Sequence, residues 1–523
     1  MQPPESAVHP IARASSQPDS VGGAHWLTLL LLLAAGTAIR FLCLLRKPFW
    51  FDECFSVEVA WVSGSNFLHL LWWREANMSL YYVLLRIWLQ FGQSEFFIRS
   101  LSVLIAGATI PAIYWLGRLL YDRRVALIAA ALFAFNAYSV RYAQEARSYA
   151  LFLLLATLSS GFLIAFVREP ARRNQRGYVL VSILAVYAHF YALLLLGVHW
   201  LALRWMGRGG HAPDQSNTPP LAHLRHAWIA IGLAVLPLLV FVAKTGAGPI
   251  KWIQRPGLRD VIEFYEHLAG GANWMLLVVC AAACVAALVP VGKALLSRDQ
   301  DWETWRSQFL LMWLFFPVVL TIVLSFARPV FLGRYMIFCL PALLILVAAG
   351  LARLRPSWVL AGGLAVVLLL CAQGISFVYG NDFDNERDAS VAAASFILDH
   401  AQAGDAVVFH VAETRIPYEF SRSHRAGQNT ASPNFTAELG PEIIFPYHGA
   451  GLDYRDFTGR PTADFLRAVA PSHPRVWIML MNNGPAGKPD PTTVMLTKVL
   501  PDSFPRMLQW EFAKVEVRLY SKQ

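Results

Sequence analysis

Charged residues are scarce in this sequence. They make up 15% of its 523 residues, whereas soluble proteins of ordinary composition carry about 25%. Hydrophobic residues account for 56%, and the mean hydropathy is +0.45. Many lie in runs that approach the roughly 20 apolar residues needed to cross a bilayer. The composition therefore excludes a soluble globular protein and predicts a polytopic α-helical membrane protein.

Cysteine is rare, and its spacing supports neither a metal site nor a disulfide framework. Five of the six cysteines lie in apolar runs, and Cys54 lies in a loop. The polar C-terminal part has no nucleotide-binding fingerprint and no catalytic-triad spacing, and no internal repeat is visible along the chain. The sequence therefore assigns no metal ligand and no cofactor, and it leaves the use of a divalent metal open.

Basic residues exceed acidic ones, giving a formal net charge of +10. In a soluble protein this excess would indicate a nucleic-acid partner. Here the Lys and Arg residues lie mostly in short loops between apolar runs, so we expect no nucleic acid. The expected partners are the lipid bilayer itself, anionic headgroups and lipid phosphates.

The apolar runs predict eleven membrane spans. Their approximate positions are 24–45, 99–119, 124–139, 148–167, 178–188, 190–206, 227–243, 272–296, 307–327, 334–352 and 357–379. The run 178–206 is too long for one span and short for two. We interpret it as two short helices that turn near His189, because Tyr187, His189 and Tyr191 make the turn polar. A single span there would move every later loop to the opposite side.

Dense arginine clusters mark one face as cytoplasmic. They lie at 118–124, 168–176 and 353–355, in the loops that follow the even-numbered spans. The opposite face carries nearly as many basic residues, and binding a lipid phosphate would explain their retention there. Residues 1–23, rich in Pro, Ser and Ala, are expected to form a disordered cytoplasmic tail. The first apolar run lacks an A-x-A-like end, so we expect it to remain as a span.

Two segments outside the spans have their own patterns. Residues 46–98 contain NFLHLLWW and SLYYVLLRIWLQF, which predict amphipathic helices at the membrane surface because Trp and Tyr favour the headgroup region. Residues 380–523 are polar and punctuated by Pro and Gly. A helical pattern at 388–402 precedes DAVVFHV, TADFLRAVA precedes RVWIMLM, and VEVRLY ends the chain. This alternation predicts a small extracytoplasmic α/β domain.

Asp52 and Glu53 are the candidate catalytic residues. They directly follow the first span in KPFWFDECFS, among several aromatic side chains. An apolar setting raises the pKa of a carboxylate and suits it to act as a base. The alternative interpretation is a solvated loop or a helix N-cap.

Other charged residues at the expected membrane edge are candidates for substrate binding, since charges there are costly to retain. Arg334 could offer a planar fork to a phosphate, or it could be an interfacial arginine that reaches for water. Arg141, Glu145 and Arg147 could bind substrate or anchor the end of a helix. The complete set comprises Arg141, Glu145, Arg147, His189, Lys251, Arg334 and Tyr335.

The order of these motifs resembles one family. Phe49–Glu53, then ANMSLYYVLLRIWLQFGQSEFFIRSLSV, RYAQEARSYAL and FLGRYMIFCLP resemble bacterial glycosyltransferases of family 39. These enzymes are relatives of the dolichyl-phosphate-mannose protein mannosyltransferases and the lipid A aminoarabinose transferases, which have the GT-C fold. The resemblance covers about residues 25–415. It departs at Ser79, where many members have proline.

The resemblance implies a GT-C transmembrane domain over 24–379 and an extracytoplasmic domain over 380–523, in the inner membrane of a bacterium. It also implies inverting transfer of a sugar from a polyprenyl-phosphate donor to a lipid, glycan or protein acceptor. Asp52 would act as base or orient the acceptor, with Glu53 beside it. From the chemistry alone, such a site needs a base for the acceptor hydroxyl and cations for the departing phosphate.

Two other functions remain open at this stage. A transporter or flippase of a lipid-linked glycan would keep its binding residues near the bilayer midplane and often shows internal repeats. A receptor would place its function in the soluble domain. The clustering of charges at one surface favours the transferase, and a single outward cavity joining Asp52, Glu145 and Arg334 would distinguish it.

Overall fold

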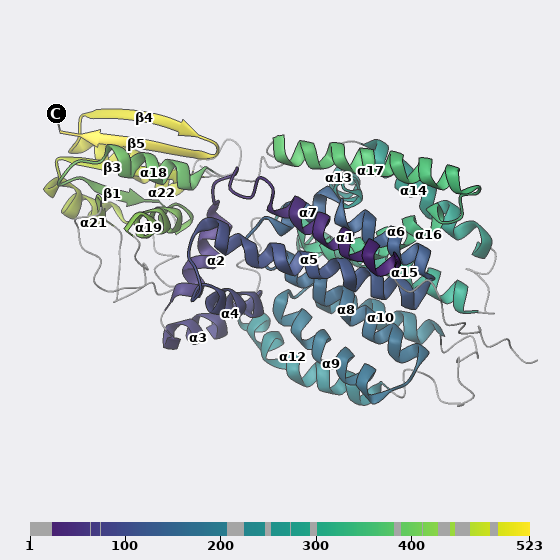
Figure 1. Cartoon of the computed structure of the whole chain (residues 1–523). Helices are drawn as coiled ribbons and strands as arrows, with labels where there is room; N and C mark the ends of the chain where they lie inside the picture. Colours follow the sequence, from purple (N-terminus) through teal and green to yellow (C-terminus); the bar gives the residue numbers. More distant parts are fainter. Residues whose placement is uncertain are drawn as a thin grey trace, which may run out of the picture.

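The computed structural model describes residues 24–62, 64–73, 75–206, 224–245, 253–271, 274–292, 301–380, 389–410, 412–426, 440–444, 461–481 and 490–522. They form a helical bundle and a smaller α/β domain, with three short helices between the two (Figure 1). The predicted tail at 1–23 lies outside the described residues.

The bundle is built from long apolar helices. Its members are α1 (Ala24–Phe41), α5 (Glu95–Leu120), α6 (Arg123–Ala134), α7 (Ala137–Ala143), α8 (Tyr149–Arg168), α9 (Arg172–Ala188), α10 (Ala192–Met206), α12 (Arg225–Thr245), α14 (Trp274–Leu288), α15 (Trp302–Ala327), α16 (Leu340–Leu351) and α17 (Ser357–Gly380). Short 3₁₀ helices, η2 (Val289–Val291) and η4 (Gly333–Cys339), extend α14 and precede α16.

In the described part of the chain, seven helical segments are long and apolar enough to cross a membrane, or eight with the bent pair α6–α7. The chain is thus a polytopic membrane protein. Helices occupy every predicted position, and the number of crossings stays a prediction.

The segment 178–206 consists of two helices, as predicted. α9 ends at Ala188 and α10 begins at Ala192. The hydroxyl of Tyr178 lies 3.3 Å from Nδ1 of His199, so α10 runs back along α9. The loop at His189 and the start of α9 are therefore at opposite ends of this hairpin.

A bend at Asn136 separates α6 from α7 by 56°. The Asn136 side chain accepts a hydrogen bond from Ser139 N at 2.8 Å and so caps the new helix. Its amide nitrogen also donates to the Leu268 carbonyl at 3.1 Å. That carbonyl belongs to α13 (Leu258–Ala269), which ends at Gly270 with φ of +93°, a conformation that glycine adopts readily. The bend tilts α7, and the arginine at its end, into the bundle.

Three short helices follow α1. They are α2 (Phe51–Trp61), α3 (Gly64–Trp73) and α4 (Ser79–Trp88). The two amphipathic helices predicted from NFLHLLWW and SLYYVLLRIWLQF correspond to α3 and α4, and α3 leaves Leu68 and Trp72 exposed. Arg86 of α4 donates to the Ala60 carbonyl at 2.9 Å, which ties α4 to the end of α2.

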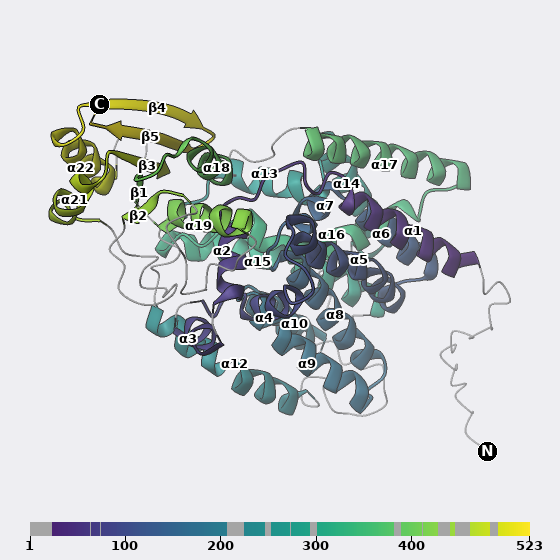
Figure 2. The same cartoon turned by 60° about the vertical axis from the view of Figure 1, so that its left-hand side comes forward.

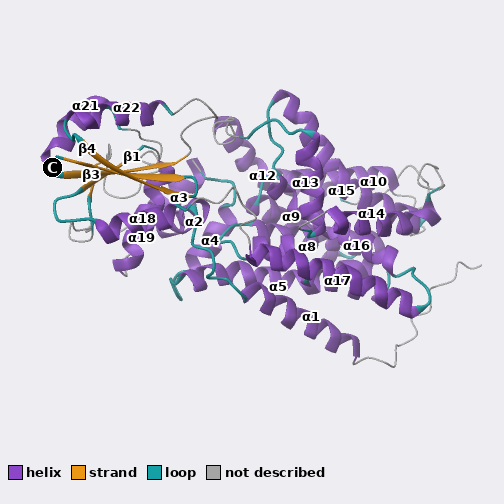
Figure 3. Cartoon of the chain, turned by 90° about the horizontal axis from the view of Figure 1, so that it is seen from above, coloured by secondary structure: helices purple, strands orange, loops and turns teal. Residues whose placement is uncertain are grey.

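The C-terminal domain is an α/β domain. Its elements are α18 (Ser390–His400), β1 (Ala406–Phe409), α19 (Ala412–Ala426), β2 (Glu442–Ile444), α21 (Ala463–Val469), β3 (Arg475–Met481), α22 (Pro491–Val499), β4 (Arg506–Phe512) and β5 (Val515–Ser521). The five strands are ordered β2-β1-β3-β5-β4, with β1 parallel to both neighbours and β5 antiparallel to both of its own. α18 and α19 cover one face and α21 and α22 the other (Figure 3). Burial on both faces explains why RVWIMLM is apolar throughout.

The C-terminal domain contacts the bundle region through α19 and α2, which lie together in Figure 2. The ring of Phe420 on α19 stacks on Phe49 at 5.2 Å and on Trp61 at 6.2 Å, measured between centroids. All three side chains are buried. Helix α2, which begins with the two candidate carboxylates, is therefore packed between the C-terminal domain and the bundle.

Candidate active site

Asp52 and Glu53 lie in the first turn of α2. The helix begins after Trp50, whose backbone is extended and whose side chain makes no cap. Acidic residues are favoured in a first turn because the backbone N–H groups there carry partial positive charge. The two carboxylates differ in exposure, however. The Asp52 side chain is 18% exposed and that of Glu53 is fully buried.

Glu53 is held by Arg99, at the beginning of α5. Arg99 Nε donates to one Glu53 oxygen at 2.8 Å and Nη2 to the other at 2.6 Å. The same guanidinium donates to the carbonyls of Leu44 and Lys47 at 2.8 and 2.7 Å. Glu53 also accepts from Ala146 N at 3.0 Å. This bidentate, buried pair and the bond to Ala146 N join α2 to α5 and to the loop before α8.

Asp52 faces Arg147, in the loop between α7 and α8. One Asp52 carboxylate oxygen lies 3.5 Å from Arg147 Nη2. Arg147 Nη1 is 3.3 Å from the Asp52 carbonyl and donates to Ser56 Oγ at 3.2 Å. Burial opposes the charged form of Arg147, but Asp52 and nearby tyrosine hydroxyls favour it, and the net result is a raised pKa. The arginine is therefore a permanent cation beside a partly accessible carboxylate.

Tyr335 and His189 interact electrostatically with both Arg147 and Arg334. Arg334 opens η4, and its guanidinium is 5.8 Å from the ring of Trp50, directly before α2. His189 is buried at the turn between α9 and α10, with its ring 4.8 Å from that of Tyr335. Burial, followed by the charges of Arg147 and Arg334, lowers the pKa of His189 to about 3. Both arginines are thus close enough to His189 to act on it electrostatically.

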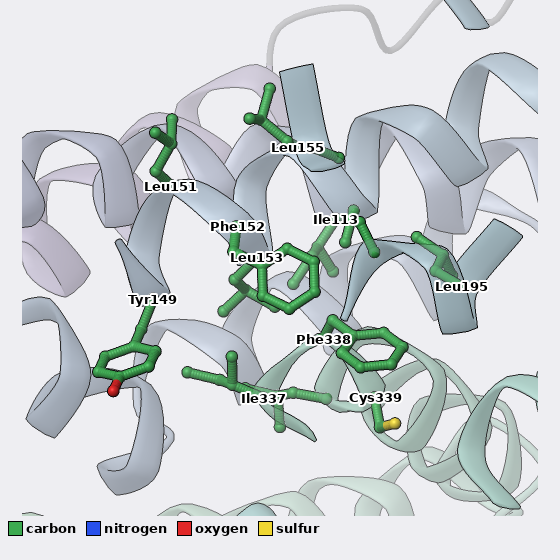
Figure 4. Packing of buried hydrophobic residues seen from close by; sticks show 14 of the residues in the cluster. Ile113, Tyr149, Leu151, Phe152, Leu153, Leu155, Leu195, Ile337, Phe338 and Cys339 are labelled. Atoms are coloured by element: carbon green, nitrogen blue, oxygen red, sulfur yellow. The ribbon is translucent and has the colours of Figure 1, made fainter. Parts of the chain in front are cut away.

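Aromatic rings line this region. Tyr149 begins α8, and its ring is 5.1 Å from Tyr142 and 6.5 Å from Tyr335. In Figure 4 its hydroxyl points away from the apolar cluster around Phe152 and Phe338. The hydroxyl is buried and has no hydrogen-bond partner among the described residues.

The remaining predicted residues are less central. Glu145 is 1% exposed and acts electrostatically, as Arg147 does, on buried Tyr81. Arg141 is also buried, with its guanidinium 4.9 Å from the ring of Tyr142. Lys251 lies outside the described residues. Within the described ranges, no group of three or more His, Cys, Asp and Glu residues could hold a metal ion.

Sequence reasoning missed four participants: Arg99, Tyr149, Ser56 and Tyr82. Burial and Glu75 raise the pKa of Tyr82 well above its usual value, and the charges of Arg147 and Asp52 also act on it, which places this α4 residue beside the pair. Arg99 could have been identified from the sequence, because it is a lone charge at the edge of a predicted span. The other three resemble ordinary helix residues in the sequence.

The fold formed by the bundle, the short helices after α1 and the C-terminal α/β domain also occurs in solved structures. The structure is similar to the crystal structure of ArnT from Cupriavidus metallidurans in the apo state. The TM-score is 0.60 at 11% identity, with 95% of this chain and 98% of that chain covered. The structure of the same ArnT bound to undecaprenyl phosphate matches equally well, at 12% identity.

A second similar structure is the Archaeoglobus fulgidus oligosaccharyltransferase in complex with Zn and sulfate. The TM-score is 0.50 at 11% identity, covering 87% of this chain and 68% of that one. No protein-family profile and no curated protein sequence matches the sequence. The similarity to these solved structures shows that the chain has the GT-C fold, as the sequence resemblance predicted.

Proposed function

We propose that this protein transfers a sugar from a polyprenyl-phosphate donor to a hydroxyl or amine acceptor at the outer face of a bacterial inner membrane. The observation that carries the proposal is the pairing of partly exposed Asp52 with buried Arg147, next to Arg334. A base and two permanent cations at one end of a membrane bundle are what this reaction needs. The binding of undecaprenyl phosphate by ArnT, a structure of the same fold, supports a lipid-phosphate donor.

In this mechanism Asp52 accepts the proton of the acceptor as the acceptor attacks the anomeric carbon. The bond from that carbon to the phosphate oxygen breaks, and the electron pair leaves with the phosphate. Arg147 and Arg334 stabilise the departing phosphate, which has gained negative charge. Attack from the side opposite the phosphate gives inversion at the anomeric carbon.

Glu53 has a structural role in this mechanism. Its bidentate contact with Arg99 and its bond to Ala146 N hold the first turn of α2 against the loop that carries Arg147. We assign it as a positioning residue and assign the base to Asp52 alone. The tyrosines and Ser56 around Arg147 offer further donors to a sugar or phosphate.

Residues 380–523 share a side of the membrane with Asp52 in this proposal. The contact between α19 and α2 supports that placement, since both helices must lie outside the bilayer on one side. The arginine-rich loops at 118–124 and 168–176 are then cytoplasmic. The transferred sugar in this proposal is a hexose or a pentose, and the acceptor is a lipid, a glycan or a protein.

The test uses the purified full chain in lipid nanodiscs with a panel of undecaprenyl-phosphate sugars. Formation of free undecaprenyl phosphate, dependent on an envelope extract and on Asp52, is the expected result. Mass spectrometry of envelope glycolipids and glycoproteins from cells with and without the gene then identifies the product. A lipid-linked sugar that crosses the bilayer without loss of its phosphate bond would establish a flippase instead.

A further inference from the structure

His189 lies in a turn that two hydrogen bonds hold against other segments of the chain. Tyr191 donates its hydroxyl to the Val330 carbonyl, which is four residues before Arg334. Phe190 N donates to the side-chain oxygen of Asn77 at 3.1 Å, just before α4. The turn is therefore fixed both to the segment that carries Arg334 and to the short helices after α1.

The hydrogen bonds of the His189 ring identify its tautomer. The backbone N–H of Tyr191 lies 3.2 Å from His189 Nδ1. A backbone N–H can only donate, so Nδ1 accepts, and a neutral ring then carries its proton on Nε2. The lowered pKa of His189, caused by burial and by the two arginines, agrees with a neutral ring.

The structure shows no interaction for the Nε2 atom of His189 within the described part of the protein. It is buried, and it has no hydrogen-bond partner among the described residues. Leaving a buried donor unpaired costs about 1–3 kcal/mol, and native structures seldom do so. The rings of Phe152, Tyr335 and Tyr191 lie 4.8–5.3 Å from the His189 ring. They fix its orientation by stacking and edge contacts.

We infer that His189 binds the donor lipid by donating Nε2–H to an oxygen of its phosphate, between the guanidinium groups of Arg147 and Arg334. A phosphate is the acceptor that suits this position, because the positive charges of Arg147 and Arg334 act on the histidine and disfavour a cationic group there. The attraction of the two arginines to the phosphate depends little on direction, whereas a hydrogen bond from the neutral histidine ring is directional. It fixes the rotation of the phosphate, and so the direction in which the anomeric carbon faces Asp52. This role rests on the proposed function and adds a residue to it.

The two ring nitrogens can be tested separately. In His189→Asn the side-chain amide reaches only the position of Nδ1, so the bond to Tyr191 N is retained and the Nε2 donor is lost. In His189→Gln the amide reaches the position of Nε2, so the donor is retained and the turn bond is lost. Binding of undecaprenyl phosphate to each full-length variant in nanodiscs is measured, with undecaprenol as the phosphate-free control. Transfer kinetics are measured in parallel.

Weaker binding of undecaprenyl phosphate by His189→Asn, by about 10- to 100-fold as for loss of a hydrogen bond to a charged group, is the expected result. His189→Gln should remain within a few-fold of wild type, and undecaprenol binding should be the same in all three proteins. Wild-type phosphate binding in a folded His189→Asn variant, or a greater loss in His189→Gln, overturns the inference and leaves the histidine a structural role. Failure of the wild-type protein to prefer undecaprenyl phosphate over undecaprenol would instead refute the proposed function itself.

Discussion

Asp52 and Glu53 are adjacent in the chain, yet their carboxylates pair with different arginines. Glu53 is fully buried against Arg99 at 2.6 Å, and Asp52 is partly exposed at 3.5 Å from Arg147. Successive residues at the start of a helix point about 100° apart, so one turns toward α5 and the other toward the site. In the proposed function, these two neighbouring acids therefore have separate roles.

This division predicts different phenotypes for two similar substitutions. Asp52→Asn should lower the transfer rate by about 10²–10⁴-fold, because an amide cannot accept the proton. It should leave expression and thermal stability close to wild type, since Asp52 is at the edge of the site.

Glu53→Gln should instead destabilise the protein. Removing one partner of a buried ion pair costs about 3–5 kcal/mol, so the melting temperature in detergent should fall clearly. The control is Glu53→Gln combined with Arg99→Met, which removes the unpaired charge and should recover part of the loss. A stable, inactive Glu53→Gln protein together with an active Asp52→Asn protein would make Glu53 the base and contradict the role proposed for Asp52.

Arg334 is predicted to bind the donor phosphate. Arg334→Ala should weaken binding of undecaprenyl phosphate by about 10- to 100-fold, as for loss of a charge-assisted hydrogen bond. Arg334→Lys should restore only part of the affinity, because a single ammonium cannot reproduce the planar fork. Arg255, which is exposed in the segment before α13, provides a control for general loss of positive charge. Arg255→Ala should bind undecaprenyl phosphate normally. Unchanged donor binding in Arg334→Ala would contradict the role.

Binding of the donor should not gain strength through protonation of His189. With a pKa lowered to about 3, the ring stays neutral from pH 8 to pH 5, whereas an ordinary histidine would become cationic below about 6.5. The lipid phosphate itself titrates near pH 6, so wild type and His189→Gln are compared over the same range. Their affinities should change in parallel. A wild-type affinity that rises on acidification relative to the variant would show that the histidine becomes charged.

Docking of the C-terminal domain is predicted to depend on Phe420. Phe420→Ala removes the ring that stacks on Phe49 and Trp61, a loss of about 3–5 kcal/mol when a buried phenylalanine is truncated. Limited proteolysis should then cut the connection after α17 faster, and transfer should slow because α2 loses one of its supports. Phe465→Ala, in α21 on the far face of the sheet, weakens the same domain without touching α2 and serves as control. Equal protease sensitivity of the two variants would argue against specific docking.

The topology is tested by cysteine labelling in a background without the six native cysteines. Gln509→Cys is on exposed β4, and Arg173→Cys is exposed in the arginine-rich first turn of α9. An impermeant reagent added to intact spheroplasts should label Gln509→Cys and leave Arg173→Cys unlabelled until the membrane is opened. The reverse pattern would place Asp52 in the cytoplasm and refute the outer-face site.

Much of this architecture could be predicted from periodicity and length. The helix positions, the turn at His189 and the strands RVWIMLM and VEVRLY follow from runs of apolar residues, which depend on local sequence alone. α19 was not predicted, because AETRIPYEFSRSHRA is polar and its few apolar side chains are divided between two surfaces. Tyr418 packs against the sheet, and Phe420 packs toward α2. Within the site, position identified Asp52, Arg147 and Arg334. The separate partner of Glu53 could not be foreseen, because Arg99 comes from another helix and only tertiary packing brings the two together.

The stacking of Phe420 on Phe49 joins residues from opposite ends of the chain. Phe49 is synthesised early, directly after the first span, whereas α19 follows the last one. Contacts so distant in sequence form late, since the intervening chain must be ordered first. The first turn of α2 therefore reaches its final packing only after the C-terminal domain has folded. A truncated or stalled chain would form its bundle without the final packing around Asp52 and Glu53.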